Sequence, residues 1–398
     1  MSAATPGELG AAPRGSLTRR QAHFLLFYAY FGFGSLLQVF PPLLGSIQQE
    51  FAVDHRTASL VMTLYLAPFV LVAIPAGIAA DRLGVMVTGR VGLLTMLFGT
   101  MVTLAAPALP VVLAGRAIAG AGSGFLLVAV LKVGTEVIPR AQLGLALGIF
   151  AAGLPAGTGV AFNLLRPLAQ LGGWRIGLLA AGGLLLSTVA VFELLASRWA
   201  QQVGLSVDPR LALRSGELWR LSTVTVLGYA AILGFTTWAP TTLVGFARIP
   251  LWAASLIASM LLIIDIPFAP LWGAVSDRIG RRRPFVIAAF TVYLIGSILV
   301  PWIAQTHAVA PLVLVIAGMG IGCAMFFPAA LTIPAETVTR ERVGAAYGLF
   351  FTAQVAGMLA GPVLIGQLLD AGSPALGFLG VSAVTALGLV AAFTLRSR

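Results

Sequence analysis

The sequence predicts an all-α integral membrane protein, with twelve transmembrane helices in two pseudo-symmetric six-helix bundles around a central cavity. Three observations support this fold class: the composition, a series of long apolar segments, and an internal repeat. Of the 398 residues, 59% are hydrophobic and only 9% are charged, whereas about a quarter of a soluble domain is charged. The mean hydropathy of +0.99 agrees.

The apolar segments give the number of spans. A helix needs about 20 predominantly apolar residues to cross a bilayer, and twelve segments approach or exceed that length. They are 22–44, 57–80, 87–106, 109–134, 143–167, 174–196, 218–246, 252–276, 284–304, 309–334, 343–369 and 375–395.

The basic residues give the orientation. If both termini are cytoplasmic, 19 of the 24 lysines and arginines fall on the inner face and 4 on the outer face. This bias predicts a multi-pass protein of the inner (plasma) membrane with both termini inside. It also explains the net charge of +11 without a nucleic-acid partner. Cys323 is the only cysteine, so no intrachain disulfide can form.

Two sequence pairs repeat at nearly half the chain length. "GIAADRLG" from Gly77 matches "GAVSDRIG" from Gly273, and "EVIPRAQLGLALGIF" from Glu136 matches "ETVTRERVGAAYGLF" from Glu336, at offsets of 196 and 200 residues. Channels and membrane enzymes can contain repeats, but repeats are a signature of secondary transporters. We therefore expect four parts, namely a cytoplasmic tail over 1–20, bundles over 21–196 and 218–398, and a cytoplasmic linker over 197–217.

The loop after the second span of each half reads G-x-x-x-D-R-x-G. The first glycine allows close helix packing, the aspartate can accept hydrogen bonds from free amides at a helix start, and the arginine can reach a carboxylate at another helix end. We expect a conformational latch that opens and closes the inner side; the alternative is a set of charges that only mark the membrane face. The candidate latch residues are Gly77, Asp81, Arg82, Gly84, Gly273, Asp277, Arg278, Gly280, Arg281, Glu136 and Glu336.

The chain resembles the major facilitator superfamily in these loops, in "LAGRAIAGAG" at 113–122 and in "GGWR" at 172–175. Val85 and Met86 depart from the pattern, because the family usually has basic residues there. The resemblance implies a monomeric transporter, not an enzyme, that works by alternating access between two bundles. "LGLALGIFAAG" and "YGLFFTAQVAG" also resemble small-anion carriers of the nitrate and cyanate type.

Two charged residues fall inside predicted spans. Asp265 lies near the centre of the eighth span, where an ionised carboxylate costs about 3 kcal/mol or more unless it is paired or solvated. A carboxyl group that gains a proton when shielded and loses it when wetted could couple proton flow to solute flow; the alternative is a buried structural aspartate. Arg116 lies in the fourth span. It could bind an anionic substrate, balance a proton-carrying acid, or tie its helix to backbone carbonyls.

Other polar residues in the spans are sparse. We expect five of them to line the cavity, with packing as the alternative: Tyr30, Gln38, Thr237, Trp238 and Gln354.

These patterns predict a secondary active transporter that moves a small organic solute, with a preference for proton-coupled uptake of an anion. The alternatives are a proton-antiport exporter of drug-like or cationic compounds, a uniporter, and a membrane sensor that does not transport. No nucleotide-binding loop or metal cluster is recognisable, so no cofactor is expected. The expected partners are the small-molecule substrate, protons and the lipid bilayer.

Overall fold

The computed structural model describes residues 17–165, 168, 172–196, 208–370 and 374–396. Nearly all of these residues are helical, and the described ranges contain no strand. Most of the expected tail over 1–20 and the 197–207 portion of the expected linker lie outside the described residues. The exact boundary between the two halves therefore stays a prediction.

The long helices follow the order of the predicted spans, and the short helix α2 lies between the first two of them. In the first half they are α1 (Arg19–Leu37), α2 (Leu44–Phe51), α3 (His55–Arg82), α4 (Val85–Leu104), α5 (Leu109–Val137), α6 (Leu143–Val160) and α8 (Trp174–Ala196). In the second half they are α9 (Gly216–Ala247), α10 (Leu251–Ile263), α11 (Asp265–Ile279), α12 (Arg283–Gln305), α13 (Val309–Thr337), α14 (Val343–Asp370) and α15 (Pro374–Phe393). Short helical turns join them, namely η1 (Pro41–Leu43), η2 (Arg140–Gln142), η3 (Ala161–Leu165), η4 (Pro209–Arg214) and η5 (Arg340–Arg342).

Eleven helical segments in the described ranges are long and apolar enough to cross a membrane, and α10 with α11 forms one of them. The helix α1 completes the set of twelve, although it is shorter than its predicted span of 22–44. It ends at Leu37 because the prolines at 41–42 lack backbone N–H groups and cannot continue it. The chain there turns into η1 and the short helix α2.

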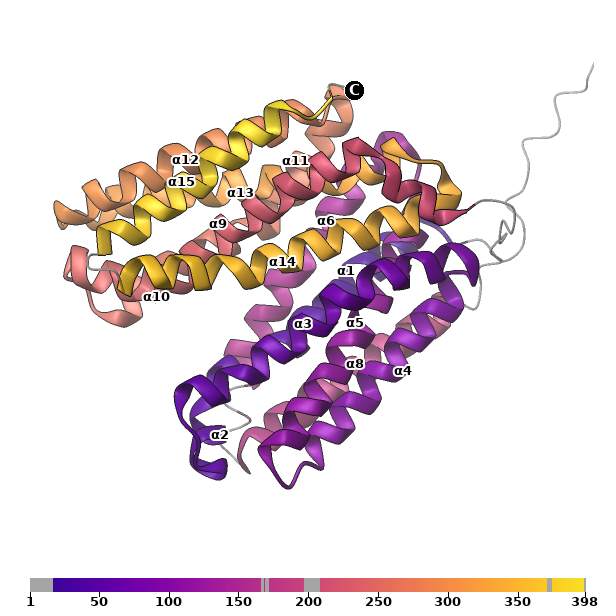
Figure 1. The fold of residues 1–398 in the computed structure, drawn as a ribbon, viewed down its shortest axis with the longest axis horizontal. Helices are drawn as coiled ribbons and strands as arrows, with labels where there is room; N and C mark the ends of the chain where they lie inside the picture. The colour runs from indigo at the N-terminus through magenta and orange to yellow at the C-terminus, as the bar shows by residue number, and fades with distance from the viewer. Residues whose placement is uncertain (1–16, 166–167, 169–171, 197–207, 371–373, 397–398) are drawn as a thin grey trace, which may run out of the picture.

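The two halves form two helix groups that meet at one end of the molecule and diverge at the other (Figure 1). Within the first half α5 packs against α3 and α4, and α1 packs against α6; within the second half α9 packs against α14 and α15. Across the interface α3 packs against α14 and α6 packs against α11. We call the end where the halves meet, which carries both G-x-x-x-D-R-x-G loops, the motif end.

The "GGWR" turn holds the opposite end of the first half together. Glu50 of α2 accepts hydrogen bonds from Trp174 Nε1 (2.7 Å) and Arg175 Nη1 (2.6 Å). Arg175 also donates to the carbonyl of Ala106 (2.8 Å). Partial burial disfavours the Glu50 carboxylate, but these hydrogen bonds and the charge of Arg175 outweigh that effect and keep the pKa of Glu50 below its usual value.

Candidate functional site

The repeated motifs of the two halves meet one another at the motif end. Gly77 of α3 crosses Gly344 of α14, and Gly273 of α11 crosses Gly144 of α6. At all four positions a Cβ atom would collide with the backbone of the facing helix. Only glycine permits these two crossings, and each crossing joins one half of the chain to the other.

Each motif aspartate caps a helix of the opposite half. Asp81 accepts hydrogen bonds from the amides of Gly344 (2.9 Å) and Ala345 (2.8 Å) at the start of α14. Asp277 accepts the same pair of bonds from the amides of Gly144 and Leu145 (both 2.9 Å) at the start of α6. The first amides of a helix have no partner within the helix and carry partial positive charge. The two carboxylates therefore join the two halves at the motif end.

Different cations balance these two aspartates. In the first half, Lys132 of α5 pairs with Asp81 at 2.6 Å and donates to the carbonyl of Ala80. In the second half, Arg282 pairs with Asp277 at 2.8 Å and with Glu336 at 3.0 Å. Both aspartates and both cations are buried or nearly so. At the repeat offset of 196 residues Arg282 corresponds to Met86, so the first-half loop has no cation at this position, and Lys132 of a neighbouring helix supplies the charge.

The motif arginines themselves lie outside these buried pairs. Arg82 makes an exposed ion pair with Asp208 at 3.5 Å, while Arg278 and Arg281 are exposed. The carboxylate of Glu336, which Arg278 was expected to reach, is held by Arg282 instead. The physical reason is that Arg278 lies in the exposed last turn of α11, whereas Arg282 follows the turn at Gly280 and points back into the protein.

Glycine is required where the motif loops turn. Gly84 precedes α4 with φ of 89°, and Gly280 ends α11 with φ of 69°. Residues with a side chain rarely adopt this left-handed backbone conformation.

Glu136 is half-buried in the last turn of α5. In the repeat, its position corresponds to that of Glu336.

Aromatic rings from both halves stack in the centre of the molecule. Tyr30 of α1 lies against Phe150 of α6, with ring centroids 4.1 Å apart and planes within 8°. Phe327 of α13 continues the stack from the other half, with its centroid 6.1 Å from that of Tyr30. The Tyr30 hydroxyl accepts a hydrogen bond from Gln354 Nε2 of α14 at 3.1 Å. The interface between the halves is thus apolar and aromatic, with a few polar groups.

Asp265 lies beside this stack, at the break between α10 and α11. The break falls at Ile264, and Pro267 in the first turn of α11 lacks the N–H that would continue the helix. Asp265 lies within electrostatic range of the Tyr30 and Tyr229 hydroxyl groups. Its Oδ1 atom is buried and has no hydrogen-bond partner among the described residues. An unpartnered carboxyl oxygen in an aromatic setting can hold a proton or attract a cation.

The comparison with protein families decides what kind of protein has this geometry. The model described as "Major Facilitator Superfamily" matches residues 23–264 and 249–398. The chain belongs to this superfamily. It is therefore a multi-pass membrane protein of a family of transporters, which are not enzymes.

Known members of the superfamily resemble this transporter to different extents. The "Probable nitrate/nitrite antiporter NarK1" of Thermus thermophilus is 28% identical over 69% of this chain, and the match spans 63% of that relative's length. The "Multi-drug resistance efflux pump PmrA" of Streptococcus pneumoniae is 33% identical, over 29% of this chain and 28% of its own. A "bacterial homologue of iron transporter ferroportin in outward-facing state" has a TM-score of 0.78 at 14% identity, over 95% of this chain and 98% of that structure.

Arg116 is buried, and its guanidinium contacts backbone carbonyls and aromatic rings. Its guanidinium donates to the carbonyls of Leu36 (3.0 Å), Leu37 (3.3 Å) and Val61 (3.2 Å). It also lies 4.1 Å from the ring centroid of Tyr65 and 4.7 Å from that of Phe40. These contacts tie α5 to the end of α1 and to α3, as in the anchoring alternative, and none of them involves Asp265.

We expect Arg116→Ala to lower the free energy of unfolding by about 4 kcal/mol, because three carbonyls lose a charged donor and a large side chain leaves a buried site. Thermal unfolding in detergent measures the effect. Arg220→Ala is the control, since that side chain is 44% exposed and its loss is expected to change stability by less than about 1 kcal/mol. A melting temperature equal to that of the wild type, with loss of anion binding, would instead support a substrate clamp.

The remaining cavity candidates are separated from the centre. Gln38 caps the end of α1, Thr237 is exposed on α9, and Trp238 donates to the carbonyl of Pro362 at 2.8 Å. Of the predicted cavity residues in the described ranges, the structure brings together Tyr30, Gln354 and Asp265. The stacked phenylalanines, Lys132 and Arg282 were missed; the one signal for Lys132 was that the only lysine of the chain falls in an apolar span.

Proposed function

We propose that this transporter exchanges a small organic cation, or a weak base in its cationic form, for protons by alternating access. Asp265 carries the proton in one half of the cycle and neutralises the substrate in the other. The observation on which this proposal depends is the buried, unpartnered Oδ1 of Asp265 beside the aromatic stack. Stacked rings favour organic cations, and one carboxyl group cannot serve a proton and a cation at once.

The contacts of Arg116 weigh against the anion preference stated above. A substrate clamp needs guanidinium N–H groups that face a ligand, whereas these groups are directed at three carbonyls. The stacked rings also suit a cation better than an anion. The partial similarity to the efflux pump PmrA supports an exporter.

Transport of a small anion is the second candidate, because NarK1 is described as a probable nitrate/nitrite antiporter and matches a larger part of the chain. In that case the donors to the anion would be polar groups such as the Gln354 amide. The two candidates differ in the charge of the substrate and in the role of Asp265.

In this proposal, the latch controls the opening and closing of the motif end during alternating access. With both aspartates on their helix starts, the motif end is shut. The excess of basic residues at this end supports a cytoplasmic orientation of the motif end. The protein would then lie in the plasma membrane. Substrate or proton exchange would then occur at the opposite end in this state, and release of the latches would expose Asp265 to the cytoplasm.

Proteoliposomes loaded with a pH-sensitive dye test the proposal. Tetraethylammonium, the cationic probe, is added outside vesicles with an acidic interior. Benzoate, the anionic probe, is added outside vesicles with an alkaline interior, because protons moving inward drive anion–proton symport. Exchange predicts that the cation raises the internal pH and accumulates, while benzoate produces no change that depends on the protein. Accumulation of benzoate would support the second candidate. Binding of either probe without flux would indicate a sensor, and flux without a pH change would indicate a uniporter.

A further inference from the structure

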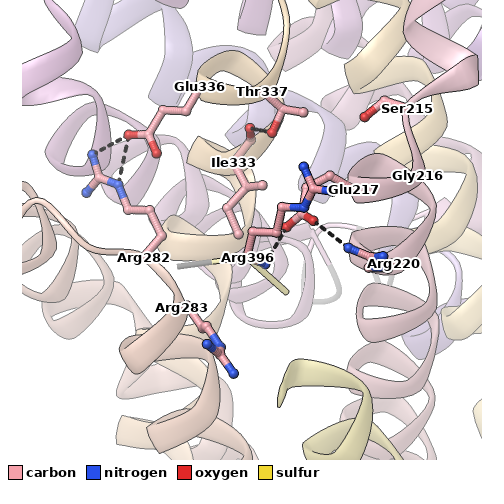
Figure 2. A pocket seen from close by; sticks show the side chains of 10 residues that line it. All are labelled: Ser215, Gly216, Glu217, Arg220, Arg282, Arg283, Ile333, Glu336, Thr337 and Arg396. Atoms are coloured by element: carbon pink, nitrogen blue, oxygen red, sulfur yellow. Dashed lines mark hydrogen bonds and ion pairs between the residues drawn. The ribbon is translucent and has the colours of Figure 1, made fainter. Parts of the chain in front are cut away.

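A charged cavity of about 220 Å³ opens at the motif end, entirely within the second half of the chain (Figure 2). Its walls are formed by Ser215 and the first turn of α9, the start of α12, the end of α13, and Arg396, which lies three residues after the end of α15. Four arginines and two glutamates give the lining a net charge of +2. The charged lining residues are Glu217, Arg220, Arg282, Arg283, Glu336 and Arg396.

Both glutamates of the lining already have partners. Glu217 accepts a hydrogen bond from the backbone amide of Arg396 at 2.9 Å and pairs with Arg220 at 3.4 Å. Glu336 pairs with Arg282 at 3.0 Å on the opposite wall, as Figure 2 shows. Neither carboxylate is therefore available to neutralise the two remaining arginines.

Those two arginines have unused donors. Arg283 donates one Nη2 bond to the carbonyl of Phe393 at 2.7 Å, but its Nε is buried without a partner among the described residues. The guanidinium of Arg396 makes no hydrogen bond or ion pair within the described ranges. A buried donor without a partner is costly, and a ligand with several acceptor oxygens would satisfy it.

We infer that this cavity binds an anion that carries a phosphate group, at a site separate from the transport centre. The planar guanidinium groups of Arg283 and Arg396 match the geometry of phosphate oxygens. The start of α9 adds the positive end of the helix dipole, although the Ser215 hydroxyl already caps the amide of Leu218 there. The site shares no residue with the Asp265 centre, so its existence does not depend on the proposed function.

The phosphate group can come from a soluble molecule or from a lipid headgroup, because the cavity lies where a span ends. Titration of the purified protein with inorganic phosphate, at constant ionic strength with chloride as the competing salt, tests the first source. Nanodiscs of phosphatidic acid diluted in phosphatidylcholine test the second source. Melting temperature and calorimetric heat are the readouts.

The variant for both arms is Arg283→Gln with Arg396→Gln, which leaves the latch residue Arg282 in place. Arg20→Gln is the matched control, because Arg20 is an exposed arginine of the first half. We expect saturable binding by the wild type and the control, and binding that is about tenfold or more weaker in the double variant.

A loss of phosphate binding in the double variant supports a soluble ligand. A lipid-dependent rise in melting temperature that the double variant lacks supports a headgroup. Equal responses of the wild type and the double variant in both arms would overturn the inference. The double variant must elute and melt like the wild type in chloride alone; if it does not, Arg396→Gln by itself replaces it, and unchanged binding by that variant counts against the site.

Discussion

Asp265→Asn is expected to abolish substrate accumulation driven by a proton gradient. Asparagine has the shape of the aspartate but can neither release a proton nor carry a negative charge. Removal of one partner of a buried charge pair costs about 2–5 kcal/mol, which corresponds to a loss of roughly 30-fold or more in the binding of a cation. The variant should fold normally, because the replaced carboxyl group has a buried oxygen without a hydrogen-bond partner in the described structure.

The measurement is the uptake of tetraethylammonium into proteoliposomes with an acidic interior, together with the internal pH. Asp208→Asn is the control, because Asp208 is half exposed, pairs with exposed Arg82 and caps η4 through the Arg210 amide, a bond that asparagine can also accept. It should transport at the rate of the wild type. Uphill transport with normal proton movement by the Asp265 variant would exclude Asp265 as the proton carrier and would reopen the anion candidate.

Gly77→Ala is expected to shift the transporter away from the conformation in which the motif end is closed. The new Cβ would meet the backbone of Gly344, which cannot move aside as a flexible side chain can. Overpacking of this kind costs about 1–3 kcal/mol, so the ratio of closed to open molecules should fall by roughly 5- to 150-fold. Because alternating access requires both states, transport should slow even though the variant lies far from Asp265.

Spin labels at the exposed positions Leu83 and Arg340 report the distance between the two halves at the motif end. The label pair should show a longer distance in Gly77→Ala than in the parent. Gly183→Ala is the matched control, because a Cβ at Gly183 in α8 meets nothing within 4 Å. That variant should keep the parental distances. An unchanged distance in Gly77→Ala would mean that the crossing is not part of the moving interface.

The sequence predicted the helices well and located both G-x-x-x-D-R-x-G loops, because both depend on local patterns. Hydropathy over about 20 residues identifies a span regardless of its neighbours, and the repeat marked Gly77, Asp81 and their counterparts as a functional pair. The repeat could not reveal that each motif docks on the other half. That pairing depends on how the two bundles meet, and no local signal of spacing or composition encodes it.

The candidate site was harder to predict because its residues gain their roles from tertiary contacts. Arg116 had the sequence context of a substrate clamp or of an anchor, and only the positions of three carbonyls from other helices favour the anchor. Phe150 and Phe327 stand among many phenylalanines in apolar spans, so nothing in their own segments marks them as a stack. Asp265 was identifiable because an ionisable group in a span is rare.

Cys323 of α13 has a practical consequence. It is the only thiol in the chain, it is buried, with 8% of the residue accessible, and it interacts electrostatically with Asp265 and Tyr229. The unmodified protein therefore carries a single reporter group beside its centre. A small maleimide alkylates the Cys323 thiol only when water reaches that region, so the alkylation rate measures how often this happens. An added solute that slows the alkylation is identified as a compound that occupies the region. A screen for the physiological substrate can thus begin with the wild-type chain, before any transport assay exists.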